Sequence, residues 1–576
     1  MPVTGPTHSH AFKGRISGGG TGARLKNALV SGLAVGVAGL IAIPILVVVG
    51  FVFVPTGAIW AHLASTVLPD YILNTVLLAL GVAALVLSIG VSTAWLVTMY
   101  DFPGRKVFGW ALFLPLAMPA YIIAYTYTGM FDFAGPVQTL LRDVFDWGRQ
   151  DYWFPQMRSV GGAALMLGLV LYPYVYLVSR AAFLEQSVAA LEVGRTLGRK
   201  PWQIFFEIAL PLARPAIVAG LALALMETLS DFGTVQYFAV DTFTTGIYRT
   251  WLGLGEPAAA AQLAALLMGV VFLLVILERI NRGGRKYHHT GGRYQEIRQI
   301  PLQGLNGFIA SLACFLPVFF GFLLPVGWLL NKSFLYPETV FNAEFPGLVA
   351  SSVSVAIGAS VIALLIAMFL VYSKRRDNRA DRRSVRQMAV RVASLGYAIP
   401  GPVLAVGVLI PFGFADNMVD AFMRDTFGIS TGLILSGTLV ALMFAYIVRF
   451  LAVSLNTVEA SVEKITPNME RAARTMGVTG LAAIFKVHIP IISGSLLTAL
   501  LMVFVDVLKE LPATLILRPF GFETLAVRAY ELASDERLAE AAGPSIAIVL
   551  AGIIPVIILS RAIARSRPGH AMDKKR

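Results

Sequence analysis

Long apolar stretches alternate with shorter polar segments along the whole chain. Because a helix needs about 20 mostly apolar residues to cross the hydrocarbon core of a bilayer, each long stretch is a candidate membrane span. Twelve stretches qualify: 28–54, 71–98, 109–131, 160–180, 214–236, 259–279, 304–330, 349–372, 389–412, 431–455, 492–516 and 541–561. The third and ninth contain prolines, and the fifth and eleventh contain charged residues. The pattern predicts an all-α polytopic membrane protein with about twelve transmembrane helices.

The composition of the 576-residue chain excludes an ordinary soluble protein. Hydrophobic residues make up 57% and charged residues only 14%, whereas soluble domains are about 25% charged. The one cysteine, Cys314, excludes an intrachain disulfide and a multi-cysteine metal site. The net charge of +13 would favour nucleic-acid binding only if the basic residues formed a patch on a soluble domain. They lie between the apolar stretches instead, so membrane topology explains them and nucleic acid is not an expected partner.

The lysines and arginines cluster in four segments of the predicted topology. These segments are 13–26, 279–298, 374–386 and 574–576, and all face one side if the chain crosses the membrane twelve times. Cytoplasmic loops carry the excess of basic residues in membrane proteins, so both termini are expected in the cytoplasm. The first stretch lacks a convincing small-residue cleavage site, and we interpret it as an uncleaved anchor.

Two distant segments repeat the same residues at a fixed offset of 279. Leu191–Gly198 resembles Glu470–Gly477, and Pro211 and Pro490 keep the offset. Each half then holds six spans, an even number, so the halves share one orientation as parallel repeats. The predicted division is a basic tail 1–26, a six-span domain 27–280, a cytoplasmic linker 281–303, a second six-span domain 304–562 and a basic tail 563–576.

The repeated segment lies between the fourth and fifth spans of each half. It reads as a short helix, a glycine that can end the helix in a left-handed conformation, and a second short helix before the next span. The pattern resembles the EAA loop of ABC-importer membrane subunits: Glu-Ala-Ala, three residues, Gly, nine residues, Ile, one residue, Leu-Pro. The first copy has Glu192, Gly198, Ile208, Leu210 and Pro211, and the second has Glu470, Arg471, Ala472, Ala473, Gly477, Val487, Ile489 and Pro490. Arg471 stands where the acid is expected, and Glu470, one position earlier, is the candidate substitute.

This resemblance implies a type I importer fold and a role for both loops. In this family the helix before the glycine is a coupling helix that docks in a groove of an ATPase, so 186–198 and 465–477 are the expected docking elements. The chain has no Gly-x-x-x-x-Gly-Lys-Ser/Thr motif. We therefore expect a transport subunit with no catalytic residue and no cofactor of its own. ATP and Mg would be bound by two separate ATPase subunits, and an extracytoplasmic binding protein would deliver the substrate.

Spans five and eleven carry acidic residues at matching positions. Glu227 corresponds to Asp506, and Asp231 to Glu510, at the offset of 279. Each pair is spaced i, i+4, so both acids of a pair share one helix face. Two interpretations are open. The four carboxylates converge and line a translocation path for a hard cation, which prefers oxygen ligands, or they pair with Lys509 and cap broken helices. No residue is firmly assigned as a metal ligand.

The surroundings of these acids resemble the ferric-iron branch of fused two-domain permeases. The matching runs are 231–234, 509–514 and 522–528, followed by the acidic stretch 531–540. The resemblance implies a permease in the bacterial inner membrane that moves ferric iron by alternating access. Related fused permeases serve thiamine, polyamines or phosphonates, so these cargoes stay open. A secondary transporter driven by an ion gradient is the alternative from another class. A membrane-embedded enzyme would need clustered catalytic groups, and only the paired acids are found.

Overall fold

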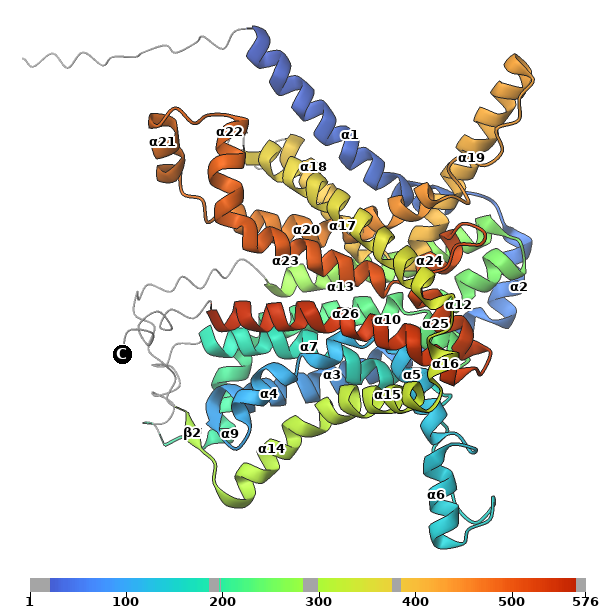
Figure 1. Cartoon of the computed structure of the whole chain (residues 1–576), viewed down its shortest axis with the longest axis vertical. Coiled ribbons are helices and arrows are strands. Elements are labelled where there is room, and N and C mark those ends of the chain that lie inside the picture. The colour runs from blue at the N-terminus through green and yellow to red at the C-terminus, as the bar shows by residue number, and fades with distance from the viewer. Residues whose placement is uncertain (1–20, 186–195, 197, 283–298, 376–384, 566–576) are drawn as a thin grey trace, which may run out of the picture.

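The computed structural model describes residues 21–185, 196, 198–282, 299–375 and 385–565 (Figure 1). These residues are almost entirely helical. The helices before the linker are α1 (Thr21–Phe51), α2 (Gly57–Thr66), α3 (Leu68–Met99), α4 (Arg105–Ala111), η1 (Leu114–Ala117), α5 (Ala120–Phe131), α6 (Pro136–Phe145), α7 (Val160–Glu185), α9 (Pro201–Gln203), η2 (Ile204–Ala209), α10 (Leu210–Ser230), α11 (Gly233–Tyr237), α12 (Phe243–Tyr248), η3 (Arg249–Gly253) and α13 (Pro257–Arg282).

The helices after the linker follow a similar order. They are α14 (Gly304–Val318), η4 (Phe319–Leu323), α15 (Leu324–Leu335), α16 (Pro337–Val340), α17 (Phe345–Arg375), α18 (Val385–Ala393), η5 (Ser394–Ala398), α19 (Gly401–Phe427), α20 (Leu439–Val462), α21 (Pro467–Thr475), α22 (Leu481–Ala483), η6 (Ile484–His488), α23 (Ile489–Leu508), α24 (Pro512–Leu517), α25 (Leu525–Ser534) and α26 (Leu538–Arg565). Two short strands, β1 (Tyr100–Asp101) and β2 (Ile300–Pro301), pair in parallel and join the end of α3 to the start of α14.

Eleven helical segments of the described chain are long and apolar enough to cross a membrane. A twelfth is present if Arg105–Ala117 and Ala120–Phe145, which meet at an angle of 91°, count as one bent span. The prediction of an all-α protein with about twelve spans is therefore confirmed.

The third, fifth, ninth and eleventh stretches are not the continuous helices that hydropathy predicts. The third and ninth break before Pro119 and Pro400, where Met118 and Ile399 are extended (ψ 116° and 120°). A residue before proline is disfavoured in the helical conformation, and the ninth span is consequently α19, Gly401–Phe427, rather than 389–412. The fifth and eleventh end earlier than predicted, and each is followed by a separate short helix, α11 or α24.

The two halves interlock. In the first half α3, α7 and α10 pack against one another, and α17, α20 and α23 do so in the second. The first helix, α1, packs against α18 and α19, while the last, α26, packs against η1 and α5. Glycines allow these approaches: a Cβ added at Gly407 would lie 2.6 Å from the carbonyl oxygen of Pro44. At Gly552 the added Cβ would lie 2.8 Å from the oxygen of Ala117. Small residues at such crossings are typical of packed membrane helices.

The polar ends of the spans fall on two sides of the molecule. The start of α1 and the ends of α13, α17 and α26 lie on one side, together with α9, α21 and α22, on the left of Figure 1. These span ends adjoin the four basic segments. On the other side lie α2, α6, α16 and α25. The described helices of the repeated loops, α9, α21 and α22, therefore lie on the same side as the span ends that adjoin the basic segments in sequence.

Candidate functional site

Both repeated loops turn at a glycine in the left-handed region. Gly198 has φ +71° and Gly477 has φ +77°, a conformation that side-chain-bearing residues rarely adopt. In the second loop this turn follows α21 directly. In the first loop, residues 186–195 and 197, which include Glu192, lie outside the described residues. After each glycine the chain passes through a π-helical segment. Segment η2 contains Ile208 and leads to Pro211, and η6 contains Val487 and leads to Pro490.

An ion pair ties α21 to a long helix of the second half. Glu470 accepts a 2.9 Å hydrogen bond from Nε of Arg375, at the end of α17, and its Oε1 forms an ion pair with Nη2 of the same residue at 2.8 Å. The same guanidinium donates to the carbonyl oxygens of Val462 (2.6 Å) and Ile465 (2.7 Å), at the end of α20. Glu470 thus occupies the position facing the protein, whereas Arg471 is exposed. Beside them, Ala472 is exposed and Ala473 is buried (2% exposed).

Two of the four predicted acids cap the short helices that follow the broken spans. Asp231 accepts hydrogen bonds from the backbone N–H groups of Thr234 (3.1 Å) and Val235 (3.2 Å) at the start of α11. Glu510 accepts from Ala513 and Thr514 (both 3.0 Å) at the start of α24. Carboxylates stabilise a helix N-terminus because they accept from its free N–H groups. The two halves therefore also share the way in which an acid caps the short helix after the broken span.

The other two acids lie in what we term the inter-half cluster: Tyr174, Glu227, Tyr397, Asp506 and Lys509. Tyr397, from η5 of the second half, donates a 2.9 Å hydrogen bond to Glu227 of α10 in the first half. Asp506 forms a 2.9 Å ion pair with Lys509, which also interacts electrostatically with Glu227 and Tyr174. The cluster thus joins α7 and α10 to η5 and α23.

These contacts bear on the two interpretations of the acids. Asp231 and Glu510 cap helices, and Asp506 pairs with Lys509, as the second interpretation describes. Glu227, which accepts from Tyr397, and Asp506, which pairs with Lys509, nevertheless both belong to the inter-half cluster. Within the described residues, no group of three or more His, Cys, Asp or Glu side chains is arranged to hold a metal ion. The inter-half cluster therefore holds two carboxylates and one ammonium group, and its described residues do not form a carboxylate cage.

Arg449 was not singled out in the sequence, although it is a lone charge within the tenth apolar stretch. Its Nη1 lies 3.2 Å from Oε1 of Glu510, and both side chains are buried. A Cβ at Gly401 would lie only 2.4 Å from that Nη1 atom, so the glycine makes room for the guanidinium. The charge inside an apolar run was the available signal.

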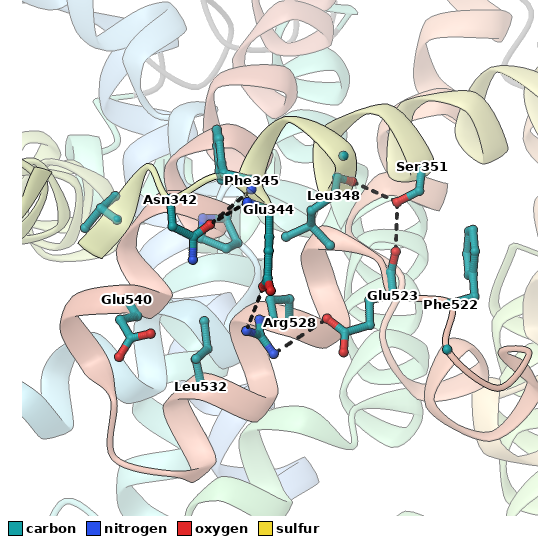
Figure 2. A pocket seen from close by; sticks show the side chains of 14 residues that line it. Asn342, Glu344, Phe345, Leu348, Ser351, Phe522, Glu523, Arg528, Leu532 and Glu540 are labelled. Carbon is teal, nitrogen blue, oxygen red and sulfur yellow. Dashed lines mark hydrogen bonds and ion pairs between the residues drawn. The ribbon is translucent and has the colours of Figure 1, made fainter. Parts of the chain in front are cut away.

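A recess opens on the side opposite the repeated loops, between α16, the start of α17, and α25 (Figure 2). Its volume is about 520 Å³. Arg528 lies 3.6 Å from Glu344 and 3.7 Å from Glu523, and Glu540 lies across the recess. Phe522, Glu523 and Arg528 belong to the run that resembles ferric-iron permeases. The sequence did not reveal that Glu344 joins them, because it precedes a different helix.

Comparison with known proteins gives one family match and several relatives. The family model described as the binding-protein-dependent transport system inner membrane component matches residues 86–283. The Fe(3+)-transport system permease protein FbpB 2 of Haemophilus influenzae is 25% identical over 498 residues, which cover 85% of this chain and 89% of that protein.

Two further relatives cover less. The ferric transport system permease protein FbpB of Actinobacillus pleuropneumoniae is 22% identical over 425 residues, 70% of this chain and 58% of that protein. The molybdenum transport system permease protein ModB of Escherichia coli is 29% identical over 230 residues, 38% of this chain and 97% of its own length. A protein of the size of one half is thus matched almost completely by a part of this chain.

Proposed function

This chain belongs to the family of binding-protein-dependent inner membrane transport components, and we propose that it is the fused permease that carries ferric iron into the cell. Members of the family are non-catalytic, multi-pass permease subunits of ABC importers. They work with an ATPase and with an extracytoplasmic binding protein, so ATP is used by the partner and not by this chain.

The alignment with the FbpB 2 protein carries the proposal of ferric iron as cargo. That protein, named as an Fe(3+)-transport permease, aligns over 85% of this chain and 89% of its own length. Both therefore share the double-length organisation, whereas the molybdenum permease aligns with 38% of this chain. The recess of Figure 2 also supports ferric iron as the cargo, because Glu523 and Arg528 in its lining come from the run that resembles ferric-iron permeases.

We place the repeated loops in the cytoplasm and assign one ATPase copy to each. The two six-span domains are 27–280 and 304–562, and the basic segments that adjoin the loop side support this orientation. In the second loop, α21 is held to α17 and α20 through Glu470 and Arg375. A displacement of α21 by the ATPase would consequently move α17 and α20 with it as a rigid body. Residues 186–198 have the corresponding task in the first half.

The four acids take two tasks in this proposal, both on the translocation path. Asp231 and Glu510 hold the short helices α11 and α24 at the tips of the broken spans. Glu227 and Asp506, with Lys509, close the path between the halves. Movement of the halves would separate Tyr397 from Glu227 and expose carboxylates to the passing cation. Charged groups inside membrane spans commonly mark such paths.

Uptake by whole cells tests the cargo. A strain without this chain is compared with the same strain carrying it on a plasmid, using ⁵⁵Fe(III), thiamine, putrescine and methylphosphonate as labelled substrates. We expect the plasmid to restore ⁵⁵Fe uptake and to leave the other three unchanged. Restored uptake of one of the other substrates, with no change for iron, would reject ferric iron as the cargo.

A further inference from the structure

A second cavity lies at the base of the second repeated loop, beside the end of α17. Its volume is about 280 Å³, and its lining combines the end of α17, α21, the turn after Gly477 and η6. The polar side chains in the lining are Tyr372, Arg375, Glu470, Arg474, Thr479 and His488. A water molecule occupies about 30 Å³ in the liquid, so the cavity has room for a small polyatomic ligand.

His488 is buried at this cavity without a hydrogen-bond partner. The residue is 6% exposed, and neither ring nitrogen has a partner among the described residues. Its ring stacks on Tyr372, with centroids 5.6 Å apart and an angle of 15° between the planes. The nearest carboxylate oxygen, Oε1 of Glu470, is 3.8 Å from Nε2, beyond hydrogen-bond distance. Buried polar groups nearly always have partners, so an unpaired imidazole at a cavity indicates a missing ligand.

The charges around His488 favour an anion. Glu470 is the carboxylate of the lining, and its ion pair with Arg375 neutralises it. Arg474, one turn later on α21, is exposed and forms no ion pair or hydrogen bond through its side chain within the described chain. A guanidinium and an imidazole N–H are therefore available together, and both donate strongly to phosphate oxygens.

In the first half, Leu191 and Arg195, which correspond to Glu470 and Arg474, lie outside the described residues, so only the rest of the corresponding cavity can be compared. It has a volume of about 170 Å³ and is lined by Arg199, Pro201 and Ile204 where the second has Val478, Gly480 and Ala483 at the offset of 279. Its other walls are mainly apolar, including Trp95 and Met99. The position of His488 is occupied by Ala209. The imidazole of His488 therefore has no counterpart in the first loop.

We propose that this cavity, between Arg474 and His488, binds a phosphate group, supplied by free inorganic phosphate or by the headgroup of an anionic lipid. Bound there, the group would link α21 to η6 at the start of α23. It would make the second loop and its following span move as one unit. The inference stands apart from the cargo and from ATPase docking, because it concerns the isolated chain.

Thermal unfolding of the purified chain in phosphatidylcholine nanodiscs tests the proposal. Sodium phosphate is compared with sodium chloride at equal ionic strength, and a second arm uses nanodiscs that contain phosphatidylglycerol and no added phosphate. We expect a concentration-dependent rise of the unfolding temperature for the unaltered chain. Arg474→Gln, on an exposed side chain, should weaken the apparent affinity about tenfold or more, because each hydrogen bond to a charged group contributes about 1.5–3 kcal/mol.

The controls distinguish inorganic phosphate, a lipid headgroup and a cavity that holds only water. Arg199→Gln removes a charge from the corresponding cavity of the first half and should leave the phosphate response unchanged. If phosphatidylglycerol raises the unfolding temperature and abolishes the effect of added phosphate, the ligand is the lipid headgroup. Equal responses of the unaltered chain, Arg474→Gln and His488→Leu in both arms would overturn the proposal, since the cavity would then hold water alone.

Discussion

The buried pair of Arg449 and Glu510 shows how single residues set the geometry of the centre. Their side chains are 10% and 2% exposed, so both charges have lost most of their solvent. Such a pair contributes little net stability, but loss of one partner leaves an uncompensated charge. Glu510 also caps α24. The arginine therefore fixes the position of the tip that follows the eleventh span.

Replacing Arg449 by Met should lower the free energy of unfolding by about 3 kcal/mol, because Glu510 would remain buried without its cation. Unfolding of the purified chain in mixed micelles measures the change. The matched control is Arg158→Gln, which breaks a 3.6 Å pair with Glu536 whose side chains are 42% and 79% exposed. That change should cost under about 0.5 kcal/mol. Equal effects of the two substitutions would show that the buried pair has no special role.

The inter-half cluster makes a prediction about transport. Glu227→Gln combined with Asp506→Asn should reduce iron uptake about tenfold or more, equivalent to at least about 1.4 kcal/mol in the barrier. The physical reason is the loss of both carboxylates of the inter-half cluster. ATPase association should not change, since the cluster is far along the spans from the loops. Normal uptake by the double variant would remove these acids from the path.

At the scale of elements, the sequence located helices well and their interruptions less well. Proline at 119 and 400 signalled a possible break, but hydropathy alone continued the third and ninth stretches through it. The cap acids Asp231 and Glu510 were visible as charges, and the short helices they cap were not, because α11 and α24 are of five and six residues. The turns at Gly198 and Gly477 were predictable, since a glycine after a helix suits φ > 0.

The left-handed conformation of Gly477, in the turn of the second loop, should make any side chain there unfavourable. Gly477→Ala should cost about 1–2 kcal/mol through left-handed strain alone, because an added Cβ would meet no atom within 4 Å. It should also weaken co-purification of the ATPase. Gly413→Ala is the control: it lies within α19 and its added Cβ is likewise unobstructed. There alanine should be neutral or stabilising by up to about 1 kcal/mol. ATPase recovery unaffected by Gly477→Ala would contradict the role of this turn.

For the whole molecule, the sequence indicated two similar halves, and the structure shows how they interlock through α1 and α26. Interlocking could not be derived from periodicity, which reports on each helix separately. The same holds for Tyr397, which reaches Glu227 from the other half, and for Glu344, which joins Arg528 across 184 positions of sequence. Contacts between distant elements depend on tertiary packing, and one sequence carries no direct record of them.

Proteoliposomes that contain this chain, with its ATPase and its binding protein, test the central claim most directly. The claim is that the two loops transmit ATP-driven movement to a cation path between the halves. ⁵⁵Fe(III) uptake is measured with ATP on the loop side, and separately with an imposed proton or sodium gradient and no ATP. We predict uptake that requires ATP and disappears when residues 186–198 are deleted. Uptake driven by an ion gradient without ATP, or undiminished by that deletion, would contradict the account.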